Sequence, residues 1–197
     1  MSSLGKAAPT CSTWAVRART GWLSLEPLWW DLPVRFTVVN LDAGPSDYER
    51  MEIRPGNACS MPEFTDNMFD IVHSNSVIEH VGQWAQMKAM AGEVRRLAPV
   101  YFVQTPNLWF PIEPHYKLPF IHWLPPQLQA HALLARKKRY LPAGSTYAEA
   151  YDLTERVQLL SKRQMRLLFP DARLIGESFA GFTKSWIALK NLPSLTS

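Results

Sequence analysis

The sequence predicts an α/β fold, with a mainly parallel sheet, helices on both faces and a C-terminal antiparallel hairpin. Residues 100–103 form a short continuous apolar run, which is typical of a central parallel strand covered on both sides. Between residues 83 and 97, apolar side chains recur at steps of three and four, as one face of a helix requires. Residues 173–179 and 183–189 flank a glycine-containing turn and predict the hairpin.

The other predicted elements follow from local signals. Residues 34–41 are β-rich and apolar and precede a cluster of turn formers, so we predict a strand there. Residues 161–164 form a capping-box opening for a helix that ends at Phe169. Residues 105–126 contain six prolines and a cluster of aromatic side chains. We interpret them as an elaborated loop, and long irregular connections in compact domains are usually functional.

Composition limits the class of protein. With 197 residues, 47% of them hydrophobic and 19% charged, the chain predicts one globular domain at residues 34–192, preceded by an irregular or altered segment at residues 1–33. The net charge of +4 falls short of a nucleic-acid footprint. Two cysteines cannot form a disulfide framework, which favours a cytoplasmic setting. No apolar run approaches the ~20 residues that span a bilayer.

The stretch at residues 69–81 is the strongest functional signal. A run typical of a buried strand turns abruptly into small polar residues, and a Glu-His pair follows where we predict the opening of a helix. In open α/β sheets the ligand lies outside the carboxyl ends of the strands. We therefore expect Asn75, Ser76, Glu79 and His80 at the rim of a ligand crevice and not in the core.

Four blocks in order resemble the class I S-adenosylmethionine (SAM) dependent methyltransferases of the small-molecule type. Residues 36–42 resemble that family's second strand, and residues 56–62 resemble its G-D-A-x-x-L-P loop beside the adenine. Residues 66–81 and 99–107 are similar to its fourth and fifth strands. The resemblance covers residues 34–190. It implies a Rossmann-like fold, SAM as cofactor, and methyl transfer to an O or N atom of an unidentified small-molecule or glycolipid-like acceptor.

The resemblance also implies a set of cofactor-binding residues, which follow the second strand, the adenine loop and the fourth strand: Asn40, Asp42, Asn57, Ala58, Asn75 and Ser76. Either Asn40 or Asp42 bonds the ribose hydroxyls, unless Asp42 simply initiates a turn. The amide oxygen of Asn57 accepts a bond from the adenine amino group, or Asn57 is an ordinary loop residue. Ser76 lines the methionine end of SAM, and it also suits the N-cap of the following helix.

Candidate residues for the acceptor lie in two places. His80 is predicted as a catalytic general base, because its pKa lies close to physiological pH, and the alternative is packing at a helix start. Beyond the fifth strand, His115 is the second catalytic candidate, and Glu113 and Tyr116 are predicted to bind the substrate. Alternatively, His115 and Tyr116 only pin the proline-rich loop onto the domain.

No metal site is predicted from the sequence. Some related methyltransferases hold a divalent metal with a Glu-x-x-Glu-His arrangement. Here the earlier acidic position is occupied by Ser76, which leaves too few hard oxygen ligands beside Glu79. The sequence also lacks a Cys-x-x-Cys spacing for zinc.

One family block is missing. The family's first strand ends in a glycine-rich turn that lets the backbone approach SAM, but residues 1–35 contain only Gly5 and Gly21. Either the N-terminal segment is incomplete or altered, or the chain is a non-catalytic remnant or binding module with weak or no SAM affinity. Loss of that strand predicts two unpaired strand edges, partly covered by some of residues 12–30, with residues 22–30 as the candidate.

Overall fold

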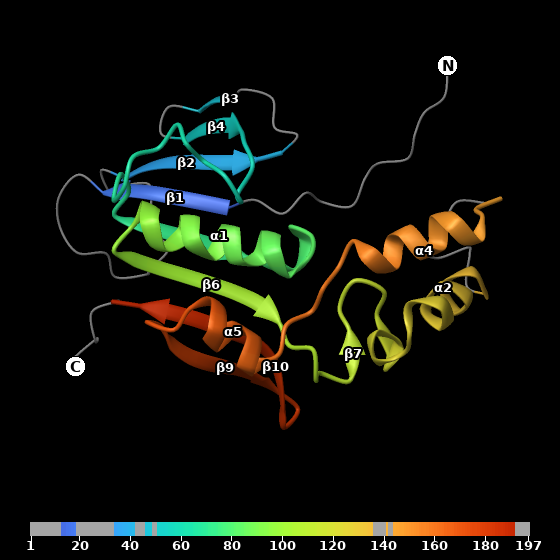
Figure 1. Ribbon diagram of the computed structural model, residues 1–197. Coiled ribbons are helices and arrows are strands. Elements are labelled where there is room, and N and C mark those ends of the chain that lie inside the picture. Colours follow the sequence, from blue (N-terminus) through green and yellow to red (C-terminus); the bar gives the residue numbers. More distant parts are fainter. Residues whose placement is uncertain are drawn as a thin grey trace, which may run out of the picture.

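The computed structural model describes residues 13–18, 34–41, 46–48, 51–135, 141 and 144–191. They form a mixed sheet of eight strands in the order β3-β4-β2-β1-β5-β6-β10-β9 (Figure 1). Its strands are β1 (Thr13–Ala18), β2 (Val34–Asn40), β3 (Ser46–Tyr48), β4 (Met51–Pro55), β5 (Ile71–Asn75), β6 (Val100–Pro106), β9 (Arg173–Phe179) and β10 (Phe182–Lys190). The helices are α1 (Trp84–Leu97), α2 (Pro126–Ala135), α4 (Tyr147–Glu155) and α5 (Lys162–Leu168).

Five strands of this sheet, β2, β4, β5, β6 and β9, share one direction. β2 pairs in parallel with β4, and β5 pairs in parallel with β6. β1 is antiparallel to both β2 and β5, so β2, β4, β5 and β6 end at the same edge of the sheet. The predicted α/β class and the C-terminal hairpin of β9 and β10 are confirmed. The sheet is mixed because β1, β3 and β10 run opposite to the other five strands.

The two strand edges left by the missing family strand are covered by β1, which lies within residues 12–30 as expected. Thr13 lies opposite Val39 of β2 on one side and opposite Ser74 of β5 on the other. Thr13–Ala18 therefore forms regular structure inside the segment that we expected to be irregular. Residues 22–30, the candidate cover, lie outside the described residues. Because β1 is antiparallel, its amino end, and not a carboxyl end, lies where β2 and β5 finish.

The main core lies between the sheet and two helices. The face of α1 predicted from its periodicity is buried, and it packs with Tyr101 and Val103 of β6. α5 begins at the predicted capping box of Ser161 and packs on the same cluster through Met165. In the described part of the chain, α1 and α5 thus share one face of the sheet. The alternating residue Phe102 points to the other face, where its ring stacks on His73 at 5.0 Å between centroids.

The segment after β6 forms a small second layer beyond the carboxyl edge of the sheet. It contains two-residue strands β7 (Ile112–Glu113) and β8 (Leu118–Pro119) and a 3₁₀ turn at Ile121–Trp123, so the prediction of an elaborated loop with little regular structure is confirmed. α2 and α4 pack against each other at this end, past the tip of β6 (Figure 1). Within the described residues, no helix has the length and apolar character needed to cross a membrane.

Candidate functional site

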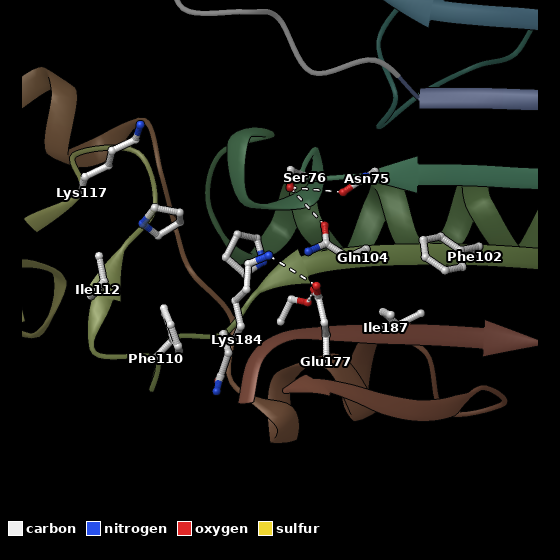
Figure 2. Close-up of a pocket in the computed structure, with 14 residues that line it drawn as sticks. Asn75, Ser76, Phe102, Gln104, Phe110, Ile112, Lys117, Glu177, Lys184 and Ile187 are labelled. Carbon is white, nitrogen blue, oxygen red and sulfur yellow. Dashed lines mark hydrogen bonds and ion pairs between the residues drawn. The ribbon is translucent and has the colours of Figure 1, made fainter. Parts of the chain in front are cut away.

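The turn after β5 places two predicted cofactor residues beside a pocket. Ser76 adopts a left-handed conformation, with φ of 55°, which breaks the strand and turns the chain away from the sheet. Its amide donates to the backbone oxygen of Gln104, and its hydroxyl donates to the Gln104 side chain at 3.1 Å (Figure 2). The N-cap of the short helix that follows is Val77, without a side-chain bond. The alternative role of Ser76 as an N-cap is therefore wrong.

The pocket has a volume of about 660 Å³ and lies over the carboxyl half of β6. Its walls come from β5, β6, β10 and the loop after β6. They combine apolar side chains, such as Phe102, Phe110 and Ile187, with a group of polar side chains. The polar group includes Glu177, which accepts hydrogen bonds from Ser185 and from Lys184 (Figure 2). The sequence analysis did not identify Glu177 and Lys184 as pocket residues, because exposed charged side chains on a hairpin give no local sequence signal of a pocket.

Two predicted catalytic residues come together close to residues that line this pocket. His80 Nε2 and His115 Nε2 lie 3.1 Å apart, although 35 positions separate the two histidines in the sequence. His115 Nδ1 faces Glu113 Oε1 at 2.6 Å, and His80 Nδ1 faces the backbone oxygen of Arg156 at 3.4 Å. Pro114, which precedes His115, lines the pocket. We call Glu79, His80, Glu113 and His115 the histidine cluster.

Glu79 lies in the core of this cluster, and not at the rim as we expected. A 3₁₀ turn at Ile78–His80 directs its side chain inward, where it is fully buried. Its Oε2 accepts a hydrogen bond from the hydroxyl of Thr105 at 2.9 Å, but its Oε1 has no hydrogen-bond partner in the described residues. Burial raises the pKa of Glu79 to about 7. A buried carboxylate with an unsatisfied oxygen is costly, which marks this position as functional.

The two imidazoles differ in their electrostatic surroundings. Burial opposes the charged form of His115, but the hydrogen bond and negative charge of Glu113 outweigh it and raise the pKa of His115 above its usual value. Burial and the neighbouring His115 lower the pKa of His80. The ligand atoms of Glu79, His80 and His115 lie within 4.8 Å of one another, so these three side chains could hold a metal ion.

The predicted substrate-binding residues make their bonds within the protein. Glu113 is buried and accepts hydrogen bonds from His115 and from the amide of Tyr116. The hydroxyl of Tyr116 donates to the backbone oxygen of Leu153 at the end of α4, 2.8 Å away. Glu113 thus holds the ring of His115, and Tyr116 ties the loop to the second layer.

The predicted adenine loop lies at the carboxyl end of β4. Gly56 donates its amide to the backbone oxygen of Asn40, and a Cβ at Gly56 would lie 2.7 Å from the Val39 side chain, so only glycine fits. Asn57 Oδ1 accepts a bond from the Cys59 amide at 2.9 Å, which closes a local turn. Ala58 packs against the core cluster. Asp42 lies outside the described residues.

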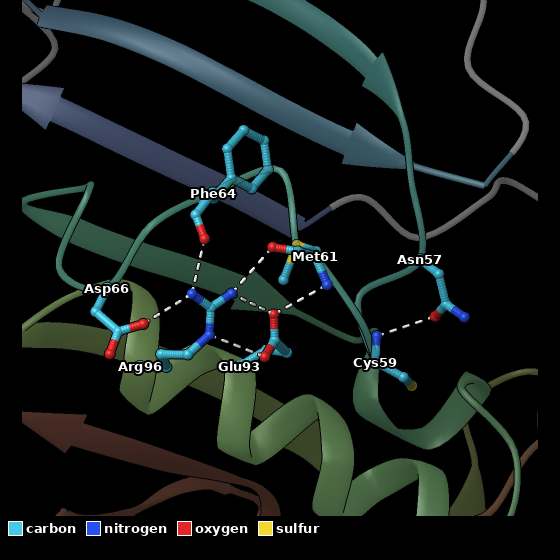
Figure 3. Close-up of polar contacts among 7 residues, drawn as sticks. All are labelled: Asn57, Cys59, Met61, Phe64, Asp66, Glu93 and Arg96. Atoms are coloured by element: carbon cyan, nitrogen blue, oxygen red, sulfur yellow. Dashed lines mark hydrogen bonds and ion pairs between the residues drawn. The ribbon is translucent and has the colours of Figure 1, made fainter.

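A network of charges fixes this loop to α1, and we call it the Arg96 cluster (Figure 3). Arg96 donates to the backbone oxygens of Met61 and Phe64, and it pairs with Glu93 at 2.7 Å and with Asp66 at 3.0 Å. Glu93 also accepts a bond from the Met61 amide. Every charged group in the network has a partner, which holds residues 57–66 in one conformation.

The family comparison agrees with the sequence blocks. Residues 32–99, which include β2, β4, β5 and α1, match the model of the family described as "Methyltransferase domain". The matched segment covers less than half of the chain, and it includes three of the four blocks that resemble the class I SAM-dependent methyltransferases. No curated protein sequence matches the chain.

Several solved structures resemble the model at low identity. A SAM-dependent methyltransferase from Methanosarcina mazei is 15% identical, with 71% of this chain and 65% of that chain covered and a TM-score of 0.38. Magnesium protoporphyrin IX methyltransferase from Synechocystis, with bound SAH, is 12% identical over 72% of this chain and 52% of that chain, with a TM-score of 0.38. A structure described as putative Zn-dependent alcohol dehydrogenases, from Rhodobacter sphaeroides, is 11% identical over 71% and 65%, with a TM-score of 0.44. In each case the chain spans less than two thirds of the matched protein.

Proposed function

We propose that this chain transfers the methyl group of SAM to an O or N atom of a small-molecule or glycolipid-like acceptor. The observation that carries the proposal is a pocket of about 660 Å³ over the carboxyl ends of β5 and β6, together with the pair of His80 and His115, which lie 3.1 Å apart next to the lining residue Pro114. Ligands of open α/β sheets bind at such edges, and a pocket of this size suits a small organic molecule.

The residues predicted for the cofactor fit a nucleoside at this edge. Asn40, the 56–58 loop and Asn75 follow β2, β4 and β5, which end together. Asn57 Oδ1 accepts one bond from Cys59, and a carbonyl oxygen has a second lone pair for an adenine amino group. Asn40 or Asp42 is assigned to the ribose, Asn57 and Ala58 to the adenine, and Asn75 and Ser76 to the methionine end.

Bound SAM supplies a methyl group on a sulfonium that is already an excellent leaving group. The chain then has to orient the acceptor, exclude water and take up a proton, so positioning dominates. Glu113 fixes the ring of His115, and His115 and His80 share a hydrogen bond between their Nε2 atoms. When an acceptor enters, one Nε2 exchanges this bond for a bond to the acceptor and takes its proton. Phe102, Phe110 and Ile187 keep the pocket apolar.

A second candidate function is a binding module that has lost catalysis. The observation that favours it is β1, which fills the place between β2 and β5 but runs antiparallel to both. Its amino end lies at the edge where the family's glycine-rich turn would cradle the methionine end of SAM. This candidate predicts weak SAM binding and no transfer.

Calorimetric titration of the purified chain with SAM and with S-adenosylhomocysteine (SAH) separates the two candidates. The proposed function predicts binding at one site, blocked in Asn75→Trp, where a large side chain would fill the edge of the pocket. The matched control Gln127→Trp places the same side chain at an exposed position of α2 and should bind like the wild type. A chain that binds neither compound would overturn the proposed function and leave the binding module.

A further inference from the structure

We propose that Glu79, His80 and His115 form a binding site for one divalent transition-metal ion of the zinc type. Each residue offers a ligand atom, and the three atoms lie within 4.8 Å of one another. The role of the ion in acting on an acceptor rests on the proposed function, whereas ion binding is measured without SAM or an acceptor.

The hydrogen bonds of the two imidazoles leave a position between their Nε2 atoms that a proton or a metal ion can fill. His115 Nδ1 faces a carboxylate oxygen of Glu113, which only accepts, so the neutral ring carries its lone pair on Nε2. His80 Nδ1 faces the backbone oxygen of Arg156, which also only accepts, so its lone pair is likewise on Nε2. Two lone pairs would then face each other at 3.1 Å. Either a proton or a metal ion must stand between them.

The separation of the two nitrogens suits a shared metal ion. Zinc–nitrogen bonds of about 2.0–2.1 Å at a tetrahedral angle place two ligand nitrogens about 3.3 Å apart. The observed distance between His80 Nε2 and His115 Nε2 is 3.1 Å. A small widening of this pair therefore admits an ion without rebuilding the cluster.

Glu79 provides independent support for the site. It is fully buried, and its Oε1 is without a hydrogen-bond partner among the residues that the structure describes. Thr105 holds the other oxygen, which fixes the plane of the carboxylate. An uncompensated buried carboxylate oxygen costs stability, and coordination of a cation removes that cost.

The groups that hydrogen-bond the two proposed histidine ligands are also typical of metal sites. Ligating histidines usually donate their other ring nitrogen to a carboxylate or a carbonyl, which fixes the tautomer and the ring orientation. Glu113 does this for His115, and Glu113 is itself buried and held by the amide of Tyr116. The backbone oxygen of Arg156 is the corresponding partner of His80.

The donor set selects the class of ion. Two imidazoles and one carboxylate suit zinc and similar borderline ions, whereas magnesium and calcium prefer oxygen ligands. Three protein ligands leave a fourth position open, as in catalytic zinc sites. An acceptor oxygen or nitrogen entering from the pocket beside Ser76 and Pro114 could take that position and be polarised there. In the ion-loaded chain both Nε2 atoms are ligands, so the ion would activate the acceptor in place of the histidine base that acts in the ion-free chain. The sequence prediction of no metal weighed the Ser76, Glu79 and His80 positions and the absence of a Cys-x-x-Cys spacing, and it did not include His115.

Titration of the chelator-treated full chain with zinc chloride tests the site, and cobalt(II) serves as a spectroscopic probe. We expect one ion per chain and visible cobalt absorption typical of four or five ligands. His80→Ala and His115→Ala should each weaken zinc binding at least 100-fold. Glu113→Gln should weaken it about 10- to 100-fold, because it only positions His115. His131→Ala, an exposed histidine on α2, is the matched control and should bind like the wild type.

Several results would overturn the inference. These are absence of zinc binding by the wild type, zinc binding that survives His115→Ala unchanged, or binding of magnesium in preference to zinc. Circular dichroism checks that each variant is folded, and His115→Gln replaces His115→Ala if the latter is not. SAH titration of the same preparation separates the two proposals: a chain that binds SAH but no zinc refutes the metal site alone, and a chain that binds zinc but no SAH refutes the proposed function.

Discussion

The Arg96 cluster and the histidine cluster are both networks of charged side chains at the edge of the same fold, but one is closed and the other is open. Arg96 makes bonds to two carboxylates and two backbone oxygens, and each of those groups is satisfied. In the histidine cluster, Glu79 Oε1 has no partner in the described residues and two imidazole nitrogens face each other. The Arg96 cluster stabilises a loop, whereas the histidine cluster keeps unsatisfied polar atoms available to a ligand.

Because of this difference, substitutions in the two clusters should change the stability of the fold with opposite signs. Removing a member of a closed network leaves its partners unsatisfied and destabilises the fold. Removing the charge of a buried carboxylate that has one unsatisfied oxygen relieves a cost that the fold carries for function. Substitutions in the two clusters should therefore change the free energy of unfolding in opposite directions.

The largest expected effect is on Arg96. Arg96→Ala leaves the Glu93 carboxylate and the backbone oxygens of Met61 and Phe64 without their charged partner. We expect a loss of about 2–3 kcal/mol in the free energy of unfolding, measured by urea denaturation, because the cluster is partly buried. Arg95→Ala on the same helix is the control and should stay within about 0.5 kcal/mol of the wild type. Equal effects of the two variants would contradict the structural role of the cluster.

The second prediction concerns Glu79. In the presence of a chelator at pH 8, Glu79→Gln should stabilise the chain by about 1–2 kcal/mol, because a neutral amide replaces a buried carboxylate with an unpaired oxygen. Glu155→Gln, at the exposed end of α4, should have almost no effect. The same urea experiment measures both. A marked destabilisation by Glu79→Gln would mean that the carboxylate holds the fold together.

The smallest effect is the pH dependence of the Arg96 cluster. The hydrogen bond from Arg96 lowers the pKa of Glu93 below its ordinary value of 4.5. A carboxyl group with a lowered folded-state pKa contributes stability that is complete above its unfolded pKa and is lost as the pH falls through the folded value. Urea midpoints between pH 6 and pH 3 should therefore fall less steeply for Glu93→Gln than for the wild type. Parallel curves would show that Glu93 does not supply this acid sensitivity.

Local patterns predicted much of the fold. The α1 face was visible as a periodicity of three and four, the α5 start as a capping box, and the final hairpin as two β-rich runs around a turn. These signals are short-range, so the sequence carries them directly. The alternation of β6 likewise places Tyr101 and Val103 in the core and leaves Phe102 and Gln104 toward the pocket.

The pairing of β1 could not be predicted in the same way. Thr13–Ala18 has no stronger strand signal than its neighbours, and its place between β2 and β5 depends on contacts with distant residues. The direction of a strand in a sheet also cannot be inferred from its composition, because side chains alternate between the two faces in parallel and antiparallel strands alike. The missing glycine turn correctly indicated a change at this position, but not an antiparallel replacement.

The histidine cluster was predicted only in part. His80 follows a recognisable strand end, but its contact with His115 depends on a loop whose path is set by tertiary packing of Tyr116 and Glu113. Glu79 was expected to be exposed because a helix was predicted to open there, whereas a 3₁₀ turn rotates it into the core. A one-residue change in helical phase is enough to reverse burial, and sequence patterns do not resolve it.

The central claim is that the histidine cluster acts on an acceptor while other residues hold SAM. Transfer of labelled methyl groups from SAM to extracts of small molecules and lipids, compared between the wild type and His115→Gln at saturating SAM, tests it most directly. We predict label in an acceptor with the wild type, a rate at least about 100-fold lower with His115→Gln, and equal SAH affinity for both proteins. Equal transfer rates for the two proteins, or no transfer by a wild type that binds SAH tightly, would contradict the claim.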